Sequence, residues 1–178
     1  MIVDILGGPK SGKSTIAGAV ALMIADIRGS EAAGVVSEGT SAMALQQCGI
    51  EEIARVRSLR GAQRAIQAQA GNAVVLDTTT RLYERALRTY RETANEFRVR
   101  EGADPDPNIS PAGWGIINER YYDSTVGAAI AAAVDLVQVH REGAVYSFDP
   151  VLGSVETEGT RTRGQSEAGA HGHLSLML

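Results

Sequence analysis

The stretch Met1–Thr15 constrains the fold of this chain more than any other. Ile2–Leu6 is apolar apart from Asp4, which is typical of a buried strand. From Ser14 to Ile27 the apolar residues recur at helical spacing. The residues that join these two segments are rich in glycine, and they are Gly7, Gly8, Pro9, Lys10, Ser11, Gly12, Lys13, Ser14 and Thr15. A strand, a glycine loop and a helix in this order predict the start of an α/β domain.

The spacing within this loop is that of a phosphate-binding loop. Gly7 is followed by four residues and then by Gly12, Lys13 and Ser14, which fits the pattern G-x-x-x-x-G-K-[ST]. Glycines let backbone N–H groups point at phosphate oxygens, and the following helix directs its positive end to the same anion. Lys13 is expected to reach the β- and γ-phosphates of ATP, and the Ser14 hydroxyl to bind Mg²⁺. The only lysines of the chain, Lys10 and Lys13, both lie here, and we predict nucleotide binding by Gly7–Thr15.

A second apolar run ends in a carboxylate. Asn72–Asp77 contains four consecutive apolar residues before Asp77, and Thr78, Thr79 and Thr80 follow it. Downstream of a phosphate-binding loop, this pattern predicts a strand buried beside the first one. Its terminal carboxylate, Asp77, is expected to support Mg²⁺ directly or through water. The threonine hydroxyls are candidates for contact with the metal, with water or with a helix start.

Polar side chains end two further predicted strands. Glu38 follows the short strand Gly34–Ser37, and at the ligand-binding edge of a parallel sheet it could polarise an attacking water molecule. The alternative is an acid at the start of the next helix, and the sequence favours neither. Gln138 and His140 end the predicted strand Val134–Val139. They could sense the γ-phosphate or make structural hydrogen bonds.

The remaining segments predict helices, a hairpin and one long loop. We expect helices over Ser41–Gln47, Glu51–Leu59, Arg81–Arg100 and from Trp114 to about Ala133, and a β-hairpin of Ala144–Phe148 and Val155–Thr157 that closes the sheet. Phe97 is expected among the inner residues of its helix, and Trp114 as a core anchor. Gly102–Gly113 has three prolines within seven residues and is expected to be a lid or a partner-binding loop.

Length and composition indicate one globular domain. The 178 residues are enough for one core, and we expect the domain to span residues 1–166, with 167–178 as a loosely ordered tail.

The charge and the cysteine content bear on partners and on the cellular compartment. A net charge of −4 gives no general reason to expect nucleic acid. Cys48 is the only cysteine, which excludes an intramolecular disulfide and favours a reducing compartment. No segment reaches the ~18 apolar residues of a membrane span, and the first strand feeds the glycine loop rather than a signal-peptide cleavage site. We expect a cytoplasmic protein.

With these segments in place, the chain resembles the RecA-like ATPases, most closely the small phage and archaeal members of the RecA, RadB and KaiC group. The similarity is carried by Gly8–Thr15, by Val74–Thr80, by Trp114–Asn118, by Ala133–Val137 with the hairpin after it, and by Arg161–Ser166. The resemblance implies a Mg²⁺-dependent ATPase that assembles into a homo-oligomer and acts on single-stranded DNA in recombination or annealing. It also implies that Arg161 and Arg163 reach the nucleotide of a neighbouring subunit, where they would stabilise the transferred phosphoryl group.

The fold expected from these observations is a three-layer α/β/α fold of the P-loop NTPase type, with a mainly parallel sheet and a C-terminal β-hairpin. Two other functions fit the same loop. A small-molecule or nucleotide kinase would use Gly102–Gly113 as its lid, but this loop contains no arginine, which counts against a kinase. The other function is a nucleotide-gated interaction module that binds ATP without hydrolysing it.

Overall fold

The computed structural model describes residues 1–8, 10–77, 79–106, 108–149, 154–163 and 174–177, and side chains as far as His140. Its elements are β1 (Ile2–Leu6), α1 (Lys13–Arg28), β2 (Ala32–Val36), α2 (Gly39–Gln47), β3 (Glu52–Arg55), α3 (Leu59–Gln67), β4 (Ala73–Asp77), α4 (Thr79–Arg100), α5 (Pro111–Tyr122), the π-helical η1 (Asp123–Gly127), α6 (Ala128–Ala131), β5 (Asp135–Val139), β6 (Arg141–Asp149), β7 (Ser154–Arg163) and β8 (Leu174–Met177).

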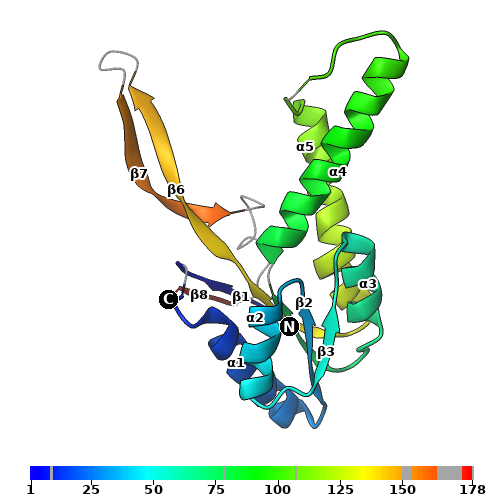
Figure 1. The fold of residues 1–178 in the computed structure, drawn as a ribbon. Coiled ribbons are helices and arrows are strands. Elements are labelled where there is room, and N and C mark those ends of the chain that lie inside the picture. Colours follow the sequence, from blue (N-terminus) through cyan, green and yellow to red (C-terminus); the bar gives the residue numbers. More distant parts are fainter. Residues whose placement is uncertain (9, 78, 107, 150–153, 164–173, 178) are drawn as a thin grey trace.

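The described strands form one parallel sheet and a separate hairpin (Figure 1). The sheet has the order β3-β2-β4-β5-β1-β8, and each neighbouring pair is parallel. This confirms the predicted α/β class with a parallel sheet. The prediction that β4 lies beside β1 is wrong, because β5 is inserted between them. Apolar runs such as Val74–Leu76 are covered by helices on both faces, so their sequence does not specify a neighbour.

The carboxy-terminal part differs from the prediction in two respects. The predicted hairpin exists, but among the described strands β6 and β7 pair with each other alone, in an antiparallel sheet, and do not close the main sheet. Leu174–Met177, predicted to belong to a loose tail, forms β8 and pairs with β1 at the edge of the sheet. Residues 164–173 of the predicted tail lie outside the described ranges.

Helices cover both faces of the sheet, in agreement with three layers. Val3, Ile5 and Val75 point to one face, where they pack against α1 and α2. Ile2 and Val74 alternate with them and point to the other face, where they pack against α3, α4, α5 and η1. The described side chains therefore form two hydrophobic clusters, one on each face of the sheet.

The segment Glu51–Leu59 is not the predicted helix. Its first half is the edge strand β3, which pairs with β2 through Ile53 and Ala54, and its last residue begins α3. Ser58 caps α3, since its hydroxyl accepts a hydrogen bond of 3.1 Å from the Gly61 N–H. This cap signal was present in the sequence and marks the true start of the helix.

The second half of α4 and the start of α5 project beyond the sheet, side by side (Figure 1). Two aromatic side chains predicted to be internal are exposed there, Phe97 at 65% and Trp114 at 39%. Both predictions are wrong because these residues lie in the part of the two helices that extends beyond the sheet. No helix among the described residues combines the length and apolarity that crossing a bilayer requires.

Candidate functional site

The loop between β1 and α1 has a backbone that favours glycine at Gly12. Gly12 adopts a left-handed conformation (φ 80°, ψ 13°) at the position just before α1, and Lys10 is also left-handed (φ 62°). Gly12 has no side chain that caps the first N–H groups of α1, and the first turn contains no acidic residue. These N–H groups are therefore suited to an external anion. Pro9 lies outside the described residues.

Lys13 turns back over this loop. Its side chain is buried, with 8% exposed. Its Nζ donates hydrogen bonds to the Gly8 carbonyl and, at 3.2 Å, to the Ser11 hydroxyl. Both of these partners are neutral oxygen atoms, and an anionic oxygen is a stronger acceptor for an ammonium group.

The side chains of Ser14 and Asp77 are in contact, although β5 lies between β1 and β4 in the sheet. The Ser14 hydroxyl donates a hydrogen bond of 2.5 Å to Asp77 Oδ2, although β1 and β4 are not neighbours in the sheet. Asp77 ends β4 and is fully buried, and its carbonyl accepts a hydrogen bond of 3.0 Å from the Ser37 N–H at the end of β2. The two residues that the sequence assigns to a magnesium ion are therefore in contact.

These groups line a cavity of about 520 Å³ at the carboxyl ends of the strands. Its walls come from the loop and first turn of α1, from Asp77, from Val139 at the end of β5, and from the start of α2. They include the predicted site residues Lys10, Ser11, Gly12, Lys13, Ser14, Thr15, Glu38 and Asp77. Gly7 and Gly8 belong to the same loop without lining the cavity. The volume is that of a small-molecule or cofactor site.

Glu38 lies at the start of α2 and faces an arginine that sequence analysis did not select. Glu38 makes no side-chain cap to its own helix. Its Oε1 accepts a hydrogen bond of 2.6 Å from Arg81 Nε, near the start of α4. The pair fixes the direction of a carboxylate that lines the cavity. The only sequence signal for Arg81 was its position directly after Asp77 and the threonines.

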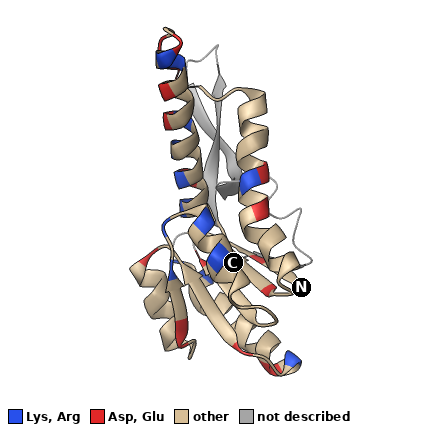
Figure 2. Ribbon diagram, turned by 90° about the vertical axis from the view of Figure 1, so that its right-hand side faces the viewer, with Lys and Arg blue, Asp and Glu red and all other residues tan. Residues whose placement is uncertain are grey.

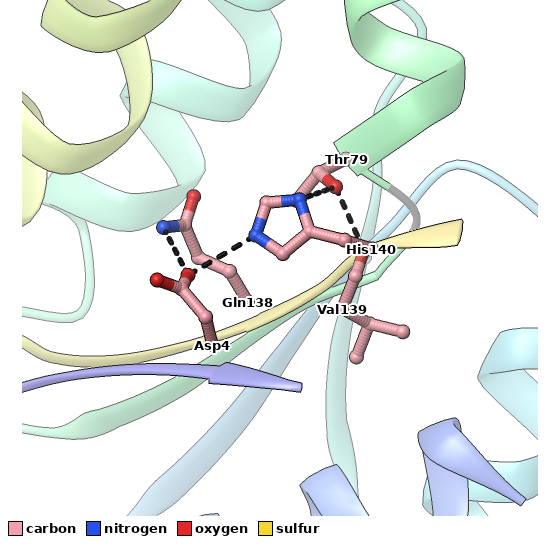
Figure 3. Close-up of polar contacts among 5 residues, drawn as sticks. All are labelled: Asp4, Thr79, Gln138, Val139 and His140. Atoms are coloured by element: carbon pink, nitrogen blue, oxygen red, sulfur yellow. Dashed lines mark hydrogen bonds and ion pairs between the residues drawn. The ribbon is translucent and has the colours of Figure 1, made fainter. Parts of the chain in front are cut away.

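The polar residues of β5 form a buried network instead of facing the cavity (Figure 3). Asp4 Oδ1 lies 3.1 Å from Gln138 Nε2, which donates to it, and 3.1 Å from His140 Nε2. His140 Nδ1 lies 2.9 Å from the Thr79 hydroxyl, which in turn donates a 2.7 Å bond to the Val139 carbonyl. Neither Gln138 nor His140 lines the cavity. Of the two interpretations of these residues, the geometry supports the structural one.

This network extends to Tyr121 on α5. The phenol is buried at 3% exposed and packs edge-on against Tyr83, with 5.4 Å between ring centroids. Burial, followed by the nearby Asp4 and Tyr83 charges, raises the pKa of Tyr121 above its usual value, although a hydrogen bond with Thr79 opposes the shift. α5 is therefore attached to the sheet through a phenol that must stay protonated.

The raised pKa of Tyr121 predicts a loss of stability in alkaline solution. Above pH ~10 the unfolded chain releases the phenol proton and the folded chain keeps it, so the free energy of unfolding falls as the pH rises. This one group contributes up to ~1.4 kcal/mol per pH unit. Denaturant titrations from pH 9 to 11.5 should give a shallower decline for Tyr121→Phe than for the parent protein. Equal slopes would contradict the assignment.

The structure gives only partial information on the two predicted arginines of the hairpin and on the predicted Mg²⁺ site. Arg161 and Arg163 lie in β7, opposite Gly143 and Arg141 of β6, and their side chains are outside the described part of the chain. Among the described residues, no three His, Cys, Asp or Glu side chains gather into a metal site. A divalent cation at Ser14 and Asp77 would therefore need oxygen ligands from a bound phosphate and water, as Mg²⁺ commonly does.

No protein-family model matches this chain, and no curated protein matches it.

Proposed function

We propose that this chain is a Mg²⁺-dependent, RecA-like ATPase that binds ATP in the cavity between Gly12 and Asp77. The observation that carries the proposal is the contact of Ser14 with Asp77 beside the buried ammonium of Lys13. A hydroxyl, a carboxylate and an ammonium at one helix N-terminus match the needs of a triphosphate and its metal ion. A structural turn would not require these three groups together.

Each group has a distinct task in this proposal. Lys13 exchanges its bonds to Gly8 and Ser11 for the terminal phosphates, where its charge offsets the negative charge of the transferred group. Ser14 and Asp77 provide hard oxygen ligands, and they fit Mg²⁺ because both line the cavity and already converge. When bound, this ion would draw charge from the phosphate oxygens.

Glu38 is the proposed group that orients the attacking water. Its carboxylate lines the cavity and is 22% exposed, so water can reach it. The 2.6 Å bond from Arg81 holds it in one direction, which is what a positioned base requires. Since Glu38 makes no cap to α2, capping does not account for its orientation.

The proposal includes assembly and single-stranded DNA, which rest on the resemblance to RecA-like proteins. Arg161 and Arg163 are expected to act on the nucleotide of a neighbouring subunit. Specific activity should then rise with protein concentration, and an Arg161→Ala/Arg163→Ala variant mixed with a Lys13→Ala variant should regain part of it. Activity that is flat with concentration and shows no rescue would leave an ATPase that works as a monomer.

Phosphate release from ATP, measured with and without Mg²⁺ and single-stranded DNA, tests the proposed function. Asp77→Asn should raise the Mg²⁺ concentration that gives half-maximal release by ~10-fold or more, because an amide is a weaker ligand and holds water less firmly. Asn keeps the volume of Asp77 and still accepts the Ser14 hydrogen bond. Asp26→Asn on the exposed side of α1 is the control. No phosphate release from the parent protein under any condition would refute the ATPase.

A further inference from the structure

A second cavity, of about 910 Å³, lies among α3, α4, α5 and η1. It is lined by five arginines and one carboxylate; the arginines are Arg57, Arg60, Arg85, Arg98 and Arg120, and the carboxylate is Asp123. It shares no lining residue with the cavity of Lys13 and Asp77. Its helices cover the opposite face of the sheet from α1 and α2. The proposed ATPase therefore assigns no role to this cavity.

The arginines of this cavity have no carboxylate partner among the side chains that the structure describes. None of the five forms an ion pair with a carboxylate in the part of the chain that the structure describes. Arg85 lines the cavity, and its Nη1 atom is buried and has no hydrogen-bond partner among the described residues. A buried guanidinium N–H without an acceptor is costly. Figure 2 shows that basic residues continue along α4.

Aromatic side chains lie between these charges. Tyr90 and Phe97 both line the cavity, and they share one face of α4 with Ala86 and Ala94. Phe97 is 65% exposed and Tyr90 is half-buried. Ala86 and Ala94 leave room next to the rings. The residues of α4 that line the cavity extend from Arg85 to Arg98, which is about 20 Å along the helix axis.

We infer that this second cavity binds a nucleotide unit, with its phosphate on the arginines and its base on Tyr90 or Phe97. Guanidinium groups form paired hydrogen bonds with phosphate oxygens. Aromatic rings accept a base by stacking, whatever its identity. An acidic peptide would use the arginines and leave the rings without a partner. The cavity volume also lies in the range of small-ligand sites.

The nucleotide unit can come from a free nucleotide or from single-stranded nucleic acid. In the second case the inference deepens the proposed function, by giving the DNA a place on the molecule. The two proposals fail separately, because Lys13 serves one cavity and Arg85 the other. Binding is therefore measured without Mg²⁺ or ATP, using dTMP, a ten-residue oligo-dT, inorganic phosphate and hexaglutamate in calorimetric titrations.

Arg85→Gln should weaken the binding of dTMP and of oligo-dT by ~10-fold or more, the usual effect of losing a charged hydrogen bond. Phe97→Ala should weaken both ligands by ~5-fold or more through lost stacking. The matched controls are Arg88→Gln and Val99→Ala, which change exposed residues of α4 outside the cavity and should have little effect. A 5-iodo-dUMP probe should crosslink to Tyr90 or Phe97 on irradiation.

The outcomes decide both the ligand and its source. Equal affinity per site for dTMP and oligo-dT supports a free nucleotide, and affinity at least 10-fold higher for oligo-dT supports a single strand. Binding of phosphate or hexaglutamate as tight as that of dTMP would overturn the inference, since it would show an anion site without base recognition. Equal losses in Arg85→Gln and Arg88→Gln, or crosslinks outside the cavity, would overturn it as well. Because Phe97 is exposed, its variant tests the inference even if Arg85→Gln fails to fold.

Discussion

Lys13→Ala is expected to abolish tight ATP binding, with an affinity at least ~100-fold lower than that of the parent protein. The reason is that Lys13 is the buried cation of the loop, and it lines the cavity in which we propose that ATP binds. Charged hydrogen bonds to an anion contribute ~1.5–3 kcal/mol each, and this ammonium would make two or more. Calorimetric titration with Mg²⁺ and ATP measures the loss.

Lys10→Ala is the matched control for this variant. It removes the same charge from the same loop, but the Lys10 side chain is exposed at the rim of the cavity. We expect a loss of only a few fold, as for other exposed charges. Thermal unfolding of both variants checks that the loop change leaves the fold intact. If Lys13→Ala bound ATP as well as the parent protein, the assignment of the loop would be wrong.

Glu38→Gln is expected to lower turnover by ~100-fold or more while ATP affinity stays unchanged. An amide still occupies the cavity wall but is not basic enough to take a proton from water, and general bases typically contribute this much. The variant should fold, because the pair with Arg81 is partly exposed and such pairs add little stability. Steady-state phosphate release and a parallel binding titration separate the two effects.

Glu31→Gln provides the control for Glu38. Glu31 is an exposed acid directly before β2, and Glu38 follows the same strand at its other end. Both variants remove one negative charge, and only Glu38 lines the cavity. If turnover is the same in Glu38→Gln and the parent protein, Glu38 is an acid that stabilises the start of α2.

The strands and helices with strong local signals could be predicted, and the exposed or weakly patterned ones could not. β1, α1, β4 and α4 carry apolar runs or helical periodicity, and their predicted ranges agree with the structure to within a few residues. β3 was taken for a helix because its four residues alternate poorly and its pairing with β2 supplies the strand conformation. Phe97 was assigned to the interior because helical spacing does not tell where the sheet below a helix ends.

The sequence by itself determined the loop, the terminal carboxylate of β4 and the α/β class. These features are local: the positive φ of Gly12 favours glycine, and Ser14 follows it at a fixed spacing on the first turn of α1. Only the tertiary structure decided that β5 separates β1 from β4 while Ser14 still reaches Asp77. It also decided that Arg81 directs Glu38, and that arginines from three helices and from the segment before α3 line a second cavity. Strand order and helix packing depend on contacts between residues far apart in the chain, which no local pattern encodes.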